Sequence, residues 1–250
     1  MVDTLGWRKV FGVVTPSTNT VVQPEYDDMR PAGVTNHVAR MFVPNDPVKS
    51  DDDFNELLRR IDVSLDDAVK SVMTCLPDHL VLGISAESIW GGGLDSARQI
   101  EKRIKAMASN IGVTQAADAL PAALKALGVK SKVGLLTPYY PLAEKPMQKF
   151  FSDIGFKIVR SHHMSCEGPV LIGNVRESEL RDHLQALDGD DIEAIVQFGA
   201  NLPMGRVAAD AERWLGKPVL AINTVTYWHA LRANDISDRV FGFGQLLAEH

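Results

Sequence analysis

The stretch Lys9-Val10-Phe11-Gly12-Val13-Val14-Thr15-Pro16 recurs in outline at Lys132-Val133-Gly134-Leu135-Leu136-Thr137-Pro138. Each copy is an apolar run that stops at Thr-Pro and is followed by polar residues. Such a run predicts a strand whose end presents side chains to whatever lies beyond it. The repetition therefore predicts one folding unit written twice, with two similar lobes and a cleft between them.

A second pair of apolar runs supports the duplication. Residues 80–86 and 194–201 both end in small and polar residues, and the spacing from the first pair is similar in the two halves. Longer helical stretches alternate with these strands. The pattern favours an α/β fold with two similar lobes, each a short, mostly parallel sheet flanked by helices, related by pseudo-twofold symmetry.

The elements can be placed along the chain from the same patterns. Strands are predicted at 10–14, 34–42, 80–84, 133–136, 157–160, 194–198 and 218–222. Helices are predicted at 52–75, 94–108, 116–127, 142–154, 177–187, 204–215 and 224–233. We assign residues 1–115 to the first lobe, completed by 217–250, and residues 116–216 to the second lobe. The turns between elements are short, which predicts that the lobes pack together.

Composition excludes several classes of protein. The 250 residues are 45% hydrophobic, and the net charge of −6 comes from interspersed acidic and basic residues, so no nucleic-acid partner is expected. Cys75 and Cys166 lie outside any CxxC or ligand-like spacing, so neither a disulfide framework nor a metal site is predicted. The first residues do not resemble a signal peptide and no apolar run reaches about 18 residues. We expect a soluble, cytoplasmic protein with no membrane partner.

Beyond these patterns, the chain resembles a known enzyme family over nearly its whole length. Four regions carry the resemblance: 12–20 (GVVTPSTNT), 133–139 (VGLLTPY), 200–202 (ANL), and 215–223 (LGKPVLAIN) with 228–231 (WHAL). They are similar to the maleate cis-trans isomerases and arylmalonate decarboxylases of the aspartate/glutamate racemase superfamily. The resemblance implies a two-lobed enzyme without metal or organic cofactor that binds a small carboxylate in its cleft. It also implies a homodimer or homotetramer.

The chain departs from this family at its two cysteines, which flank the reacting carbon from the two lobes. Aligning the loop after 80–83 places Ile84 at the first cysteine, and aligning 198–202 places Gly199 at the second. Isomerisation through a thiol requires a thiolate that adds to the double bond, and two-base racemisation requires an acid and a base. Ile84 and Gly199 supply neither.

Groups that would hold a carboxylate are retained, and the resemblance implies that Asn19 and Tyr139 contact the substrate. The predicted catalytic residues are Asn19, Ser85, Glu87 and Tyr139. The predicted substrate-binding residues are Ser17, Ala86, Gly199, Ala200 and Asn201, with the backbone amides of Ala86, Ala200 and Asn201 as donors. Such donors stabilise the negative charge of an enediolate. Glu87 is the nearest candidate for the proton donor, or for a base that activates water.

Each of these residues also has a structural interpretation. Asn19 suits a helix cap after Thr-Pro, and Tyr139 suits a packed aromatic ring. Ser85 suits a local hydrogen bond with the backbone, and Glu87 suits an exposed loop. The pair Trp228-His229 lies on a predicted helix and is assigned to packing.

Two further residues have a possible role in chemistry. Cys166 follows His162 and His163, and a thiol activated by converging imidazoles would be a nucleophile, although a free cysteine is more often an inert small residue. Arg206 begins a predicted helix and could pair with a carboxylate, or simply be exposed.

Three functions remain open from the sequence. The leading hypothesis is a thiol-free lyase that decarboxylates a small acid through an enediolate. The second is a hydrolase that opens an amide, imide or lactone with water activated by Glu87. The third is a non-catalytic protein that binds small acids.

Overall fold

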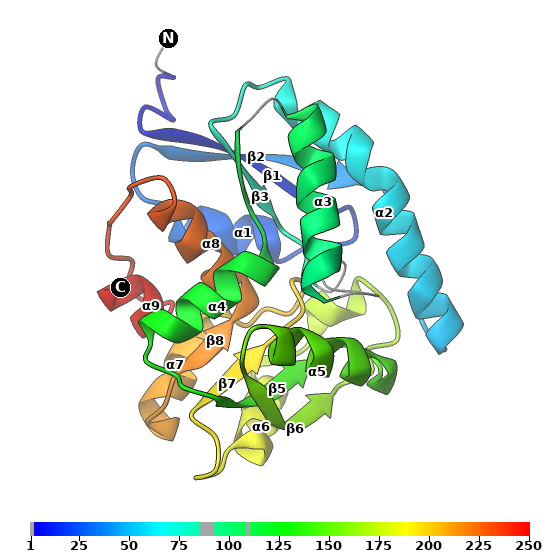
Figure 1. Cartoon of the computed structure of the whole chain (residues 1–250), viewed down its shortest axis with the longest axis vertical. Helices are drawn as coiled ribbons and strands as arrows, with labels where there is room; N and C mark the ends of the chain where they lie inside the picture. The colour runs from blue at the N-terminus through cyan, green and yellow to red at the C-terminus, as the bar shows by residue number, and fades with distance from the viewer. Residues whose placement is uncertain (1–2, 86–92, 109–110) are drawn as a thin grey trace.

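The chain folds into two four-stranded sheets, each flanked by helices (Figure 1). The structure is a computed structural model, and it describes residues 3–85, 93–108 and 111–250. Strand order is β2-β1-β3-β4 in the first sheet and β6-β5-β7-β8 in the second, and every neighbouring pair is parallel. The prediction of two similar lobes with parallel sheets is confirmed.

The first lobe is built around the central strand β1. Its strands are β1 (Lys9–Pro16), β2 (Val34–Met41), β3 (His79–Leu82) and β4 (Gly112–Thr114). Its helices are α1 (Val22–Met29), α2 (Asp51–Met73) and α3 (Leu94–Met107). Strand β3 is buried along its whole length and β1 is buried from Phe11 to Thr15, as expected of parallel strands that are covered on both faces.

The second lobe repeats the arrangement around β5. Its strands are β5 (Lys132–Thr137), β6 (Lys157–His163), β7 (Ala194–Gln197) and β8 (Val219–Ala221). Its helices are η2 (Pro141–Ala143), α5 (Glu144–Asp153), η3 (Leu171–Asn174), α6 (Glu177–Leu187) and α7 (Gly205–Leu215). The connecting helices are α4 (Ala116–Ala126) and α8 (Ile222–Arg232), and α9 (Gln245–Glu249) ends the chain.

Helix α4 runs from the first lobe to the second, and α8 returns the chain to the first lobe (Figure 1). The predicted boundary at residue 217 is corrected, because β8 pairs with β7 and so belongs to the second sheet. From Ile222 onward the chain packs against α1, α4 and β3. One buried cluster contains Phe11 and Val81 of the first lobe together with Val133 and Phe198 of the second. The lobes therefore share a core.

The shared strand order fixes where a ligand can bind. In each sheet the chain passes to one side of the central strand and then to the other, so the loops after β1 and β3, and after β5 and β7, diverge and leave a crevice at the carboxyl ends. The two crevices face each other across the lobe boundary. Among the described helices, none has both the length and the apolar character needed to cross a membrane.

Candidate active site

A cavity lies where the four strand ends meet, and its wall includes Pro16, Ser85, Pro138 and Ala200. Its volume is about 60 Å³. On a scale where one water molecule needs about 10–15 Å³, this space holds several waters or a small organic acid. The described part of the wall has no charged side chain.

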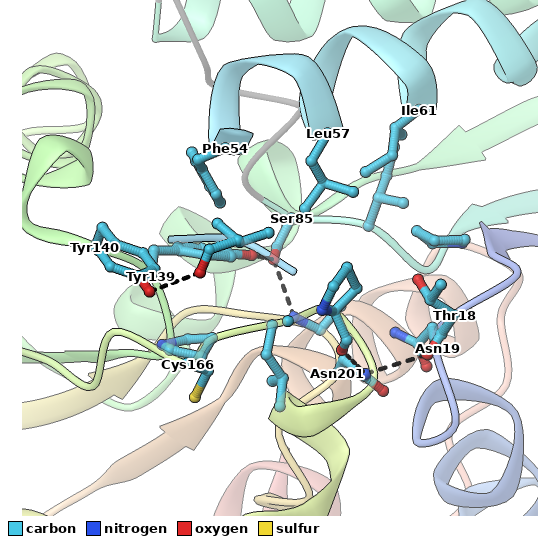
Figure 2. A pocket seen from close by; sticks show the side chains of 18 of the residues that line it. Thr18, Asn19, Phe54, Leu57, Ile61, Ser85, Tyr139, Tyr140, Cys166 and Asn201 are labelled. Carbon is cyan, nitrogen blue, oxygen red and sulfur yellow. Dashed lines mark hydrogen bonds between the residues drawn. The ribbon is translucent and has the colours of Figure 1, made fainter. Parts of the chain in front are cut away.

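One side of the cavity is apolar and comes from α2. Phe54, Leu57 and Ile61 are three and four residues apart, so they lie on one face of this helix, and all three point into the cavity (Figure 2). Helix α2 has a well-capped N-terminus, because the Ser50 side chain accepts a hydrogen bond from the Asp53 N–H and three aspartates occupy the first turn. The well-defined start sets which face of α2 meets the cavity.

A chain of hydrogen bonds joins the lobes on the opposite side of the cavity. The Ala200 backbone N–H donates to Ser85 Oγ at 3.1 Å, and Ser85 Oγ lies 3.3 Å from the Tyr139 hydroxyl (Figure 2). The Tyr139 ring also packs against Phe54, with centroids 5.2 Å apart. The predicted residues Ser85, Tyr139 and Ala200 are thus brought together from three strand ends.

Asn19 caps a helix and also lines the cavity. Its Oδ1 accepts the backbone N–H groups of Val21 and Val22, each at 2.9 Å, which satisfies donors in the first turn of α1. With Oδ1 occupied, the amide NH₂ is the group left for a ligand, and it has no hydrogen-bond acceptor in the described part of the chain. The Arg40 guanidinium fixes the backbone here by donating to the Asn19 carbonyl at 2.7 Å.

Asn201 uses its side chain to hold loops together. Its Oδ1 accepts the Thr20 N–H at 2.8 Å, and its Nδ2 donates to the Pro169 carbonyl at 2.7 Å. The Asn201 backbone N–H has no acceptor among residues 3–85, 93–108 and 111–250. Of the predicted backbone donors, the Ala200 amide is therefore engaged by Ser85 and the Asn201 amide is open.

Two predicted contacts are corrected by the structure. The Ser17 hydroxyl donates to the Val43 carbonyl at 3.1 Å and accepts the Val43 N–H at 2.9 Å, so it ties two loops of the first lobe together and does not line the cavity. Gly199 does not line it either. Its φ is +151°, and an added Cβ would lie 2.6 Å from Pro138 Cγ, so the site requires glycine.

The predictions for Ala86 and Glu87 fall outside the described residues. Ile84, the residue placed at the first cysteine of the family, lines the cavity and is buried among apolar residues of the first lobe.

Sequence reasoning missed Thr18 and the apolar face of α2 as parts of the site. Thr18 lines the cavity beside Asn19 (Figure 2). Its position in the polar run 17–20 after the first strand was a usable signal.

Cys166 lines the cavity, but its thiol is not activated. Burial, together with the nearby Glu179 carboxylate, raises the thiol pKa to about 11. His163 Nε2 lies 2.7 Å from Glu144 Oε2, and the His162 ring packs on His183, so the two imidazoles are engaged elsewhere. In Figure 2 the sulfur points away from Ser85 and Tyr139. His162 and His163 therefore do not converge on the Cys166 thiol, as the nucleophile hypothesis required.

Other candidate residues lie away from the cavity. Trp228 is buried, and His229 Nδ1 lies 3.3 Å from Thr114 Oγ1, so this pair serves packing as predicted. Arg206 is exposed and donates to Asp28 at 2.8 Å, and so pairs with a protein carboxylate. No group of three or more metal-binding side chains occurs in the described ranges.

Comparisons with known proteins agree with this fold. No family model matches the chain. A maleate isomerase of Pseudomonas putida is 26% identical over 252 residues, which cover 95% of this chain and 96% of the relative.

Solved structures agree over similar lengths. The Nocardia farcinica maleate cis-trans isomerase has a TM-score of 0.86 at 23% identity, covering 96% of this chain and 98% of its own. A variant of that isomerase carries a covalently bound succinylcysteine intermediate. Arylmalonate decarboxylase has a TM-score of 0.74 at 16% identity, covering 95% and 98%. One relative aligns along almost its whole length, so the chain is similar in sequence to a maleate isomerase, and it shares its fold with maleate isomerases and with arylmalonate decarboxylase.

Proposed function

We propose that the protein is a thiol-free lyase that decarboxylates a small acid carrying two carboxyl groups on one carbon. The observation that carries the proposal is the division of the cavity into a polar side and an apolar side. Neutral hydrogen-bond donors come from the ends of β1, β3, β5 and β7, and apolar side chains come from α2.

The polar side suits the carboxylate that stays in the product. The Asn19 NH₂, the Thr18 hydroxyl and the Asn201 backbone N–H are all available to carboxylate oxygens. As the carbon–carbon bond breaks, its electron pair moves into this carboxylate and forms an enediolate. Donors already fixed around these oxygens stabilise the growing charge by a few kcal/mol each, on the order of one oxyanion-hole contact.

The apolar side suits the carboxylate that leaves. Phe54, Leu57 and Ile61 offer no hydrogen bond to an anion, whereas carbon dioxide is neutral and needs none. Loss of carbon dioxide is thus favoured where water is excluded.

The enediolate must then take up a proton at carbon. The Ser85 and Tyr139 hydroxyls border the cavity, and Glu87 follows Ser85 by two residues in the sequence. We retain Glu87 as the proposed acid, with Ser85 and Tyr139 as the groups that position the substrate and its proton donor.

Thiol-dependent isomerisation is disfavoured by the state of Cys166. The succinylcysteine found in the Nocardia farcinica enzyme variant requires a reactive sulfur. Here the thiol pKa of Cys166 is raised to about 11, so the thiol is protonated near neutral pH.

The test compares substrates and follows the products. Phenylmalonate, methylmalonate and maleate are incubated with the protein, and carbon dioxide, fumarate and the remaining acid are measured. We expect carbon dioxide from a malonate, no fumarate from maleate, and unchanged turnover after thiol alkylation. Fumarate formation, or loss of turnover in proportion to alkylation of Cys166, would refute the proposal.

A parallel reaction in oxygen-18 water separates lyase from hydrolase. Solvent label in a newly formed carboxyl group of an amide, imide or lactone substrate, without carbon dioxide release, would assign hydrolysis. Binding of these acids with no turnover of any of them would assign a binding protein.

A further inference from the structure

Glu25 on α1 is an acidic residue outside the cavity that connects to its wall. Its Oε1 accepts the Gly205 backbone N–H at 2.8 Å, and its Oε2 accepts from Asn223 Nδ2 at 2.7 Å. Gly205 begins α7 and Asn223 lies in the first turn of α8. The carboxyl group therefore sits where three helices of the two lobes meet.

Asn223 passes this contact on to the cavity wall. The same Nδ2 donates to the Ala200 carbonyl at 2.9 Å, so its two hydrogens are both used, one by Glu25 and one by Ala200. Asn223 is buried. An amide held at both hydrogens has one orientation, and that orientation fixes the direction of the Ala200 carbonyl.

The Ala200 carbonyl and the Asn201 N–H belong to one peptide unit. In a trans peptide these two groups point in opposite directions. Because the carbonyl is held toward Asn223, the Asn201 N–H is directed away from it, and Asn201 lines the cavity. A hydrogen bond to the carbonyl also polarises the peptide and strengthens its N–H as a donor.

We propose that Glu25 is a positioning residue that orients the Ala200–Asn201 peptide, through Asn223, so that its N–H binds the carboxylate of the substrate. This role rests on the proposed use of the cavity for a small carboxylate. It does not depend on which bond of the substrate breaks.

The ionised form of Glu25 is the one that fits its partners. Both partners are N–H donors, so a proton on the carboxyl group would face a donor and weaken one of the two bonds. Other charged or titratable groups near it are Asp28 and Tyr26 on α1 and Arg206 on α7, while α8 contributes only the neutral Asn223.

A buried, ionised Glu25 lowers the stability of the folded chain, so its presence at this position argues for a functional role. Burial raises the Glu25 pKa from 4.5 to about 7. The folded chain thus binds this proton more tightly than the unfolded chain, so the contribution of Glu25 is most favourable below the unfolded pKa and is lost as the pH rises through about 7. A neutral residue would avoid this loss.

The chain offers a matched control in Glu212. It lies near the end of α7, burial raises its pKa as well, and its carboxylate accepts the backbone N–H groups of Gln245 at 2.8 Å and Val219 at 3.3 Å. None of these residues lines the cavity. Glu212→Gln therefore reproduces the loss of a partly buried carboxylate without touching the link to Asn201.

The experiment follows the Asn201 backbone amide by NMR across pH in the wild type, Glu25→Gln and Glu212→Gln. We expect the wild-type amide signal to titrate with a midpoint near 7, since Glu25 changes charge there. The titration should vanish in Glu25→Gln and persist in Glu212→Gln. A titration that survives Glu25→Gln, or that is lost equally in Glu212→Gln, would overturn the proposal.

Calorimetric binding of phenylmalonate and maleate provides the second readout. We expect about tenfold weaker binding in Glu25→Gln, as for one misaligned charge-assisted hydrogen bond, and wild-type binding in Glu212→Gln. Asn223→Leu, which removes the same link from the other side, should match Glu25→Gln, and the double variant should be no weaker than either. Additive losses would show that the two residues act separately.

This design keeps the two proposals apart. The amide titration is measured in the free protein and needs no turnover. If no malonate is decarboxylated while the titration depends on Glu25, the lyase proposal fails and the positioning role stands. If malonates are decarboxylated while the titration of the Asn201 amide does not depend on Glu25, the lyase proposal stands and the positioning role fails.

Discussion

The two lobes share one topology but contribute different chemical groups to the cavity. The first lobe supplies side chains, namely the Asn19 amide after β1 and the Ser85 hydroxyl after β3. The second lobe supplies the Tyr139 hydroxyl after β5 and the Asn201 backbone N–H after β7, while the Ala200 N–H is bound by Ser85. Duplication of the fold therefore sets where the groups stand, whereas the residues at the strand ends set what each side does.

The helices that follow β2 in the first lobe and β6 in the second lobe also differ. After β2 the chain crosses residues 42–50 and enters the 23-residue α2, whose apolar face lines the cavity. After β6 it crosses residues 164–176 and enters α6, which has 11 residues. The two crossing loops meet, because the Val48 N–H donates to the Glu167 carbonyl at 2.9 Å. The Tyr140 hydroxyl, which follows β5, also donates to the Val48 carbonyl at 2.7 Å. The water-excluding surface thus comes mainly from one lobe.

The largest expected effect is on the second lobe, from Gly199→Ala. The change forces an L-residue to a φ of +151° and drives its Cβ into the Pro138 ring. We expect a loss of about 3 kcal/mol or more in the free energy of unfolding, because backbone strain and overpacking each cost about 1–3 kcal/mol. Denaturant unfolding measures it.

Gly128→Ala is the control for backbone strain alone. Gly128 has a φ of +70°, and nothing lies within 4 Å of its added Cβ. This variant should lose about 1–2 kcal/mol. Equal losses in the two variants would mean that contact with Pro138 does not exclude a side chain, such as that of cysteine, from position 199.

The next effect is confined to the first lobe and depends on pH. His79 begins β3, where the second lobe has Ala194 at the start of β7, and its Nε2 lies 2.8 Å from Thr114 Oγ1. Burial, with His229 and Lys9 nearby, lowers its pKa from 6.5 to about 4. The unfolded chain takes up this proton first, so stability falls as the pH drops from 6.5 toward 4.

We expect His79 to account for a loss of about 2–3 kcal/mol over that range, at about 1.4 kcal/mol for each pKa unit. Unfolding in denaturant at neutral and acidic pH, compared between wild type and His79→Gln, measures it. The acid-dependent part should shrink in His79→Gln and remain in His37→Gln, which changes an exposed histidine on β2. An unchanged pH slope in His79→Gln would contradict the assignment.

A smaller effect tests the hydrogen bonds that join the lobes. Ser85→Ala leaves the Ala200 N–H without its acceptor, whereas Tyr139→Phe keeps that bond and removes only the terminal hydroxyl. We expect Ser85→Ala to cost about 1–3 kcal/mol of unfolding free energy and Tyr139→Phe about 0.5–1.5 kcal/mol. The reverse order would indicate that Tyr139, and not Ser85, holds the lobes at this point.

Local patterns predicted most of the fold. The run ending in Thr-Pro predicted β1 and β5, and the apolar spacing predicted α6 at residues 177–187. Helix α1 was missed because Pro24 interrupts its polar run and its first turn is capped by Asn19, which lies outside it. Strand β6 extends to His163, beyond the predicted end at residue 160, because pairing with β5 outweighs the polar character of its last residues.

The site was predicted only where its residues follow strands. Ser85 and Tyr139 follow strands of different sheets, and they were placed together because the internal repeat predicts two lobes whose strand ends face one cleft. The periodicity that predicted α2 identifies an apolar face, but it does not distinguish a face that covers a core from one that lines a cavity. Glu25 and Asn223 are 198 positions apart, and no local pattern links them.

The smallest expected effect concerns the remaining sulfur of the site, which comes from the second lobe. Because the Cys166 thiol has a pKa of about 11 and turns away from Ser85 and Tyr139, Cys166→Ser should leave kcat within about threefold of wild type, a change below about 0.7 kcal/mol. Turnover of phenylmalonate at several pH values measures it, and Cys75→Ser, which changes a cysteine away from the cavity, is the control. If Cys166→Ser abolished turnover while Cys75→Ser did not, Cys166 would act as a nucleophile. The second lobe would then supply the reactive group of the site, and the first lobe only groups that bind the substrate.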